Sequence, residues 1–260
     1  MPEIFFEEKG KGLPVVLLHG FCENHELWLS FLHHLSKTNY VLVPDLPGFG
    51  NSELPSNDLS LADVAGWLKK WLDHKNIERC VMIGHSLGGY VTLEFAKAYP
   101  EAVSAIGLFH SSAFSDHQEK KDNRTKTIEF LKSNGVAPFI QTFVPGLFYE
   151  GNHEELNHRL AQQKDVGMQC KLETVISYTI AMRDRSGSEE LIRNFKKPFL
   201  LIAGVHDNAV PLEKSKKMAE MIPHADTHFL ENAAHMGMFE QEAETLKIVE
   251  QFLKKVPREV

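Results

Sequence analysis

A serine at the tip of a glycine-bounded turn is the feature that most constrains the fold of this chain. Residues 84–89 read GHSLGG, follow the apolar run Cys80–Ile83 and precede a helical pattern from Tyr90 to Ala98. Glycines two positions before and two positions after Ser86 let a strand and a helix approach closely, while the turn carries the serine in a strained backbone conformation. The sequence therefore predicts a strand, a sharp turn and a helix, with Ser86 presented at the turn.

Short apolar runs alternate with helical patterns along most of the chain. Runs rich in Val, Ile, Leu and Phe are typical of strands that are buried on both faces of a parallel sheet. The stretch Leu59–His74 has its apolar residues on one helical face, and Ser60 can cap its start. This alternation predicts the α/β fold class, with a doubly wound, mostly parallel sheet and right-handed crossovers. The expected strands are Val15–Leu18, Tyr40–Val43, Val81–Ile83, Ala105–Phe109, Phe199–Ala203 and Thr227–Leu230, and the other expected helices are Tyr90–Tyr99, Leu212–Met221 and Glu242–Lys255.

Residues 113–193 break this alternation because they contain no strand-like run. Their helical stretches carry charged residues on one side and large apolar residues on the other. A segment of this length is too long for a simple loop, so we expect a helical cap inserted into a core formed by residues 1–112 and 194–260. Such a cap would cover the carboxyl ends of the strands, where open α/β sheets bind ligands; a helical layer packed elsewhere is the alternative. Candidate substrate-binding residues in the cap are Phe114, Phe139, Phe143, Phe148 and Met182.

Two residues far downstream of Ser86 are candidates for the groups that activate it. A serine hydroxyl is a weak nucleophile near neutral pH and needs a base, which a carboxylate orients and stabilises. Asp207 lies just beyond a buried apolar run, and His235 follows the last expected strand among small residues. His110 and His206 are rival candidates for the base. We expect Ser86 to be the nucleophile, His235 the base and Asp207 the orienting acid.

Acyl transfer also requires hydrogen-bond donors for the negatively charged oxygen of the tetrahedral intermediate. One expected donor is the backbone N–H of Leu87, directly after the nucleophile. The other is the N–H of Phe21, in the loop that follows the run Val15–Leu18, where Gly20 gives the backbone freedom to turn the amide inward. His85 is also next to the nucleophile, and we expect it to point away from the substrate and to have a structural role.

Together these motifs resemble the α/β-hydrolase superfamily. The resemblance covers the whole predicted core and leaves the cap unmatched. It identifies the GHSLGG turn as a nucleophile elbow and implies the chain order nucleophile, acid, histidine. Within the superfamily the chain is similar to small cap-bearing carboxylesterases, lactonases and carbon–carbon bond hydrolases, in which the stretch Asp45–Ser52 is mainly a structural loop. The motifs that carry the resemblance are His19-Gly20-Phe21, Asp45–Ser52, Gly84–Gly89, Asp207 ahead of Val210-Pro211, and His235.

The expected function is that of a serine hydrolase which cleaves a small, partly apolar ester or lactone through an acyl-enzyme. Cleavage of a carbon–carbon bond by the same triad is the alternative enzyme function, and a ligand receptor that retains the triad is the alternative from another class. This chemistry needs no metal or organic cofactor, and the sequence has neither a zinc-ligand spacing nor a dinucleotide-binding glycine pattern. A basic run in the expected cap is interpreted as a solvated helix face, with attraction of an acidic substrate as the alternative. That run consists of Lys120, Lys121, Arg124 and Lys126.

Charge and cysteine content limit the expected partners and compartment. The net charge of −7 argues against nucleic acid as a partner, and no apolar run approaches the length of a membrane span. Residues 1–8 lack the basic and apolar regions of a signal peptide, and Cys22, Cys80 and Cys170 have no disulfide or zinc spacing. We therefore expect a cytoplasmic protein whose partner is a small-molecule substrate, with no nucleic-acid or membrane partner. The sequence leaves its oligomeric state open.

Overall fold

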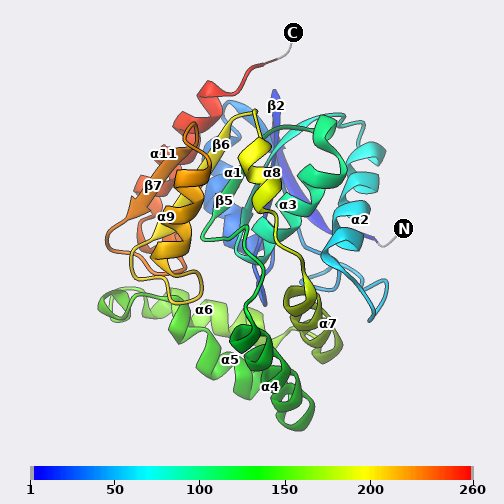
Figure 1. Cartoon of the computed structure of the whole chain (residues 1–260), viewed down its shortest axis with the longest axis vertical. Coiled ribbons are helices and arrows are strands. Elements are labelled where there is room, and N and C mark those ends of the chain that lie inside the picture. Colours follow the sequence, from blue (N-terminus) through cyan, green and yellow to red (C-terminus); the bar gives the residue numbers. More distant parts are fainter. Residues whose placement is uncertain (1–2, 259–260) are drawn as a thin grey trace.

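A single sheet lies at the centre of the protein (Figure 1). The computed structural model describes residues 3–258, so the first two residues of the acidic N-terminal stretch lie outside it. Within these residues seven strands form the sheet in the order β1-β3-β2-β4-β5-β6-β7, and all neighbours are parallel except β1 and β3. This confirms the predicted α/β fold class. The strands are β1 (Phe6–Gly10), β2 (Leu13–Leu18), β3 (Asn39–Pro44), β4 (Cys80–His85), β5 (Val103–Phe109), β6 (Phe199–Gly204) and β7 (Asp226–Leu230).

Strand β1 is the part of this sheet that the sequence did not predict. Its residues Glu7, Glu8 and Lys9 are charged, and the last two are exposed. Because β1 is an edge strand with a single neighbour, it needs no continuous apolar run, and charged side chains on an edge strand also hinder pairing with other chains. Each of the other six strands contains its predicted run and extends it by one or two residues at one or both ends.

Helices cover both faces of the sheet because the central strands are apolar on both sides. In β2, for example, Val16 and Leu18 pack on one face, whereas Val15 and Leu17 pack on the other. Helices α2 (Leu61–His74), α3 (Leu87–Ala98), α8 (Glu189–Asn194) and α9 (Leu212–Met221) contribute to the first face, and α1 (Leu29–Leu35) and α11 (Glu242–Lys255) to the second. Helix α2 begins after Ser60, whose hydroxyl accepts a hydrogen bond from the N–H of Asp63.

Helices α4 to α7 lie together beyond one end of the sheet, and we call residues 118–184 the helical segment (Figure 1). Helix α8, which follows it, returns to the sheet and packs beside α9. The helices of the segment are α4 (Gln118–Asn134), α5 (Val136–Phe143), α6 (Asn157–Met168) and α7 (Leu172–Asp184). The remaining helices are α10 (Gly237–Glu240) and the short 3-10 turns η1 (His25–Trp28), η2 (Pro100–Ala102), η3 (Pro145–Leu147) and η4 (Glu150–Asn152).

Helix α7 joins the helical segment to the loop after β3. The hydroxyl of Thr174 donates to the carbonyl oxygen of Gly48 at 3.1 Å, and that of Tyr178 donates to the carbonyl oxygen of Pro47 at 2.9 Å. Within the loop, the hydroxyl of Ser52 donates to the carbonyl oxygen of Asp45 at 2.8 Å. These contacts give the loop a structural role. None of the helices among residues 3–258 combines the length and the apolar character needed to cross a membrane.

Candidate active site

Ser86 occupies a sharp turn between β4 and α3. Its backbone angles, φ 50° and ψ −112°, lie in a region that residues other than glycine rarely adopt. A side chain at Gly84 would collide with the backbone of Gly88, and one at Gly88 would collide with the carbonyl groups of β2 and the residue after it. The hydroxyl of Ser111, two residues beyond the end of β5, donates to the carbonyl oxygen of Ser86 at 2.7 Å and holds the turn. The glycines therefore allow the close strand–helix contact that exposes Ser86.

Asp207 and His235 are in direct contact at the same end of the sheet. The Nδ1 atom of His235 donates to Asp207 Oδ2 at 2.7 Å. Asp207 Oδ1 accepts from the N–H groups of Ala209 and Val210, each at 2.8 Å, so the turn after β6 fixes the carboxylate. Burial by itself would raise the pKa of Asp207, but the imidazoles of His235 and His110 outweigh burial and hold the pKa well below its usual range. Asp207 is thus an ionised carboxylate that orients His235.

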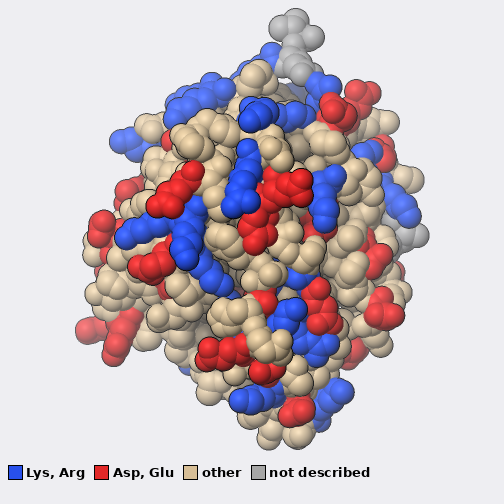
Figure 2. All heavy atoms as spheres, viewed as in Figure 1, with Lys and Arg blue, Asp and Glu red and all other residues tan. Residues whose placement is uncertain are grey.

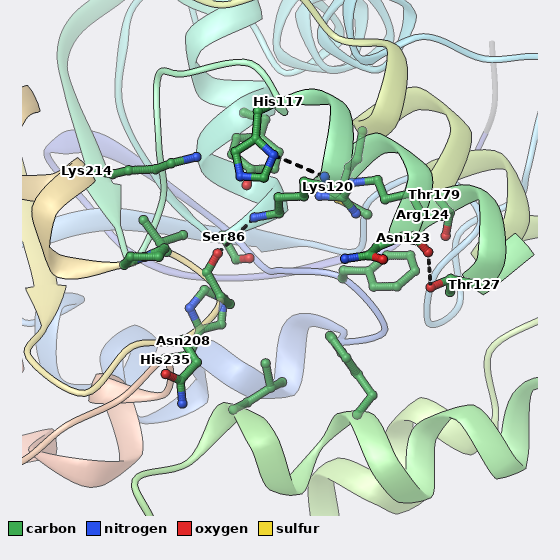
Figure 3. Close-up of a pocket in the computed structure, with 18 of the residues that line it drawn as sticks. Ser86, His117, Lys120, Asn123, Arg124, Thr127, Thr179, Asn208, Lys214 and His235 are labelled. Atoms are coloured by element: carbon green, nitrogen blue, oxygen red, sulfur yellow. Dashed lines mark hydrogen bonds between the residues drawn. The ribbon is translucent and has the colours of Figure 1, made fainter.

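Ser86 and His235 line one cavity of about 510 Å³ beneath the helical segment. Figure 3 shows both side chains at this cavity. Since Nδ1 of His235 is directed to Asp207, its Nε2 atom is the ring nitrogen that remains for chemistry in the cavity. The three residues that the sequence selected from different parts of the chain therefore meet at one place.

The two rival histidines do not line this cavity. The ring of His206 stacks on Tyr149 with centroids 3.9 Å apart. His110 is fully buried, with Nδ1 3.4 Å from Asp207 Oδ2, and its Nε2 accepts from the N–H of Gly237 at 3.2 Å. His110 therefore lies against Asp207 without lining the cavity.

The potential ligand atoms of His110, Asp207 and His235 lie within 4.8 Å of one another, a spacing that could hold a metal ion. In this geometry Asp207 already accepts a hydrogen bond from His235 and lies beside His110. To bind a metal ion, Asp207 would have to give up its contacts with the two imidazoles. The observed pattern therefore fits a carboxylate that orients imidazoles.

The two expected oxyanion donors lie beside Ser86. Leu87 is the first residue of α3, and the side chain of Phe21 lines the cavity that contains Ser86. Among residues 3–258, no protein acceptor takes the N–H of Leu87 or of Phe21. Their role as oxyanion donors therefore stays a prediction that these unpaired amides allow.

A buried ion pair that the sequence did not reveal connects the Phe21 loop to His235. Glu23 Oε2 accepts from the N–H of Gly20 at 2.5 Å and from His85 Nδ1 at 2.9 Å. The other ring nitrogen of His85 donates to the carbonyl oxygen of His235 at 2.9 Å. Burial would lower the pKa of His85, but the Glu23 carboxylate outweighs burial and raises it. His85 faces away from the cavity, and no motif in the sequence indicated Glu23 as its partner.

Glu240 is a half-buried carboxylate that the sequence did not single out. Its Oε2 accepts from the N–H groups of Ala234 and Met236, on either side of His235, at 2.9 and 3.1 Å. Its Oε1 accepts from the N–H of Tyr149 at 2.6 Å. Burial raises the pKa of Glu240, against these hydrogen bonds. Glu240 therefore fixes both the His235 loop and the adjoining part of the helical segment.

The cavity has an aromatic wall formed by Phe21, Phe139 and Phe143. The rings of Phe139 and Phe143 stack with centroids 5.0 Å apart, and Phe21 meets Phe143 edge to face at 5.9 Å. Met182 also lines the cavity. Of the expected substrate-binding residues, Phe114 and Phe148 do not line it. Phe148 is buried beside Phe239 of α10, and Phe114 packs partly buried against the core that contains α2 and α3.

Only part of the basic run in α4 lines the cavity. Lys120 and Arg124 line the cavity, whereas Lys121 and Lys126, which belong to the same run, do not. The interpretation of a solvated helix face therefore does not fit Lys120 and Arg124, which are half-buried. Lys214, which no sequence pattern indicated, lines the cavity from α9.

Comparisons with known proteins agree with this architecture. A family model described as the alpha/beta hydrolase fold matches residues 14–242. An uncharacterized protein of Mycobacterium tuberculosis is 24% identical over 95% of this chain and 77% of its own length. A thermophilic esterase from Thermogutta terrifontis, solved with malate bound, superposes with a TM-score of 0.94 at 28% identity, over 98% of this chain and 94% of the other. An enol-lactonase from Burkholderia xenovorans superposes with a TM-score of 0.90 at 23% identity, over 98% and 97% of the two chains, which shows a shared fold.

Proposed function

The chain belongs to the alpha/beta hydrolase fold family, and from this premise we propose that it is a serine hydrolase acting on a small, partly apolar ester or lactone. The hydrogen bond of 2.7 Å between His235 Nδ1 and Asp207 Oδ2, beside a serine held at positive φ on the same cavity, carries the proposal. A solved esterase of 28% identity supports hydrolysis of an ester.

The proposed reaction uses only side chains and backbone groups of this chain. The Oγ atom of Ser86 attacks the substrate carbonyl carbon while His235 Nε2 accepts the hydroxyl proton. The N–H groups of Phe21 and Leu87 donate to the resulting oxyanion. Collapse of this intermediate breaks the bond to the alcohol oxygen, which takes the proton from His235, and leaves the acyl group on Ser86. Water then attacks the acyl carbon while His235 takes its proton. The bond between the acyl carbon and Ser86 Oγ breaks, His235 returns the proton to Oγ, and the acid is released.

Residues 113–193, which contain the helical segment, act in this proposal as the substrate-binding cap on a core formed by residues 1–112 and 194–260. The support is that α4, α5 and α7 each contribute residues to the cavity that contains Ser86. Phe139, Phe143 and Met182 provide its apolar surface, which suits the hydrocarbon part of a substrate.

A panel of neutral esters and lactones, with and without EDTA, tests the proposal together with a serine-directed phosphonate. Turnover that survives EDTA, disappears in Ser86→Ala and is blocked by phosphonate on Ser86 would support it. Labelling at another residue, or full activity in Ser86→Ala, would overturn the assignment of the nucleophile. Turnover of a vinylogous diketone but of no ester would indicate carbon–carbon bond cleavage. Binding without turnover of any of these compounds would indicate a receptor.

A further inference from the structure

Basic side chains gather on one side of the proposed catalytic cavity, although the whole chain is acidic. Lys120 and Arg124 of α4 and Lys214 of α9 line it, and the chain has a net charge of −7. Figure 3 shows Lys120 and Lys214 on the same side of Ser86, away from His235 and Asn208. On the outer face drawn in Figure 2, basic and acidic side chains are interspersed. The positive charge at the cavity therefore contrasts with the mixed charge of this face.

Arg124 shares its carboxylate partner with a second arginine. Its Nε atom is 2.5 Å from Asp116 Oδ2, and Arg185 approaches the other oxygen of the same buried carboxylate at 2.9 Å. Asp116 thus faces two guanidinium groups, and within residues 3–258 it forms no ion pair with either lysine.

The two lysines have no carboxylate partner. The ammonium group of Lys120 donates to a neutral acceptor, the carbonyl oxygen of Ala209, at 2.9 Å. The ammonium group of Lys214 forms no hydrogen bond and no ion pair with any residue in the range 3–258, although its backbone N–H donates to the carbonyl oxygen of Pro211. Glu119, the carboxylate that lines the cavity, is exposed and likewise forms no ion pair in this range. Two ammonium groups at the cavity are therefore left without a compensating anion.

Both lysines also occupy unfavourable positions in their helices. Lys120 is the third residue of α4, and Lys214 is the third residue of α9. The first turn of a helix carries partial positive charge and favours Asp or Glu, so a lysine there adds repulsion. Burial, and then the nearby Lys120, lower the pKa of Lys214 and outweigh the opposite effect of Asp116. An anion bound between the two helix starts would relieve all of these costs.

We propose that the cavity binds an ester or lactone that carries a second, negatively charged group, and that Lys214 and Lys120 bind this group. A carboxylate fits the site, because each ammonium can donate a charge-assisted hydrogen bond to it. The aromatic wall then covers the hydrocarbon between the carboxylate and the scissile bond. This inference rests on the proposed function for its reaction, but its binding step is independent of turnover.

Binding to the Ser86→Ala protein, measured by titration calorimetry, tests the inference directly. The probes are monomethyl adipate, which is a half-ester with one carboxylate, and dimethyl adipate, which is neutral and of nearly the same shape. We expect the half-ester to bind at least about tenfold more tightly than the diester. Adding Lys214→Met should remove about tenfold of that preference, whereas Lys217→Met, an exposed position on the same helix, should leave it unchanged.

Salt provides a second measurement that does not depend on a lysine variant. Raising NaCl from about 50 to about 500 mM should weaken binding of the half-ester severalfold more than binding of the diester. Equal affinities for the two probes, no detectable binding of the half-ester, or an equal loss for both probes in Lys214→Met would overturn the inference. If the half-ester binds through Lys214 but the wild-type protein hydrolyses neither ester, the anion site stands and the proposed function fails. If dimethyl adipate is hydrolysed and the half-ester has no advantage in binding, the proposed function stands and the anion site fails.

Discussion

The Nε2 atom of His85 lies 2.9 Å from the carbonyl oxygen of His235, so the residue before the serine turn is hydrogen-bonded to the backbone of the proposed base. Through its other ring nitrogen His85 pairs with Glu23, which in turn accepts from the N–H of Gly20 beside Phe21. One buried ion pair thus holds the loop of an expected oxyanion donor and the loop of the base at fixed positions relative to Ser86.

Replacing His85 with Leu should lower kcat about tenfold to a hundredfold and change KM little. The reason is that the His235 loop loses its donor while the walls of the cavity stay in place, and small displacements of a catalytic group are costly. Steady-state kinetics on a neutral ester, with melting temperatures to confirm folding, would measure the effect. A rise in KM with unchanged kcat would show that the pair supports substrate binding and not the base.

Replacing His235 with Ala should reduce kcat/KM by several orders of magnitude, about as much as Ser86→Ala, because the members of a triad act as a unit. Asp207→Asn should cost the same or less, since it leaves the geometry but removes the charge that orients the base. His206→Ala is the matched control, because its ring stacks on Tyr149 outside the cavity. A larger loss from His206→Ala than from His235→Ala would indicate that His206, and not His235, is the base.

Acid should destabilise the protein through His110. Burial lowers the pKa of His110 to about 4, whereas an exposed imidazole titrates near 6.5. As the pH falls below about 6.5, the unfolded chain takes up a proton that folded His110 does not accept until the pH nears 4. The stability contributed by neutral His110 is therefore complete above about pH 6.5 and is lost between there and pH 4, by at most about 3 kcal/mol.

Urea unfolding of the wild type and of His110→Asn between pH 8 and pH 4 would measure this loss. Asn tolerates the positive φ of 49° at this position and does not titrate. The variant should lose less stability over the same interval. Parallel pH profiles for the two proteins would show that other groups cause the loss.

Shortening the aromatic wall should change acyl selectivity without a general loss of activity. In Phe143→Ala the cavity gains room, so preference should move from acetate toward hexanoate and octanoate esters, while the rate on acetate stays within about tenfold. Phe148→Ala is the control, because Phe148 is buried outside the cavity. It should cost about 3–5 kcal/mol of folding stability and leave the order of preference unchanged. A uniform fall in rate for all chain lengths in Phe143→Ala would contradict a role in selectivity.

Local patterns in the sequence were enough to locate the core of the fold and the residues of the proposed triad. The buried strands are continuous apolar runs, and Ser86 lies between glycines that only a close strand–helix contact requires. Edge strand β1 lacks such a run, so the same reasoning missed it.

The walls of the cavity depend on how distant segments pack, which one sequence does not encode locally. Phe143 and Phe148 look alike in the sequence, but only the first reaches the cavity. Lys120 and Lys214 are each unremarkable among surface lysines, and they become a pair only because α4 and α9 begin at the same opening. Glu23 and Glu240 were missed for the same reason, since Glu23 pairs with the side chain of the distant His85 and Glu240 accepts from the distant N–H of Tyr149.

The contact between the helical segment and the sheet also limits how such a protein can diverge. The N–H of His235 donates to the carbonyl oxygen of Leu147 at 2.9 Å. A backbone hydrogen bond thus joins the helical segment directly to the proposed base. Insertions or exchanged helices elsewhere in the segment can remodel the cavity at little cost to the reaction. The stretch around Leu147 has no such freedom, and a chimera that shifts it by one residue would acquire a new pocket together with a misplaced base.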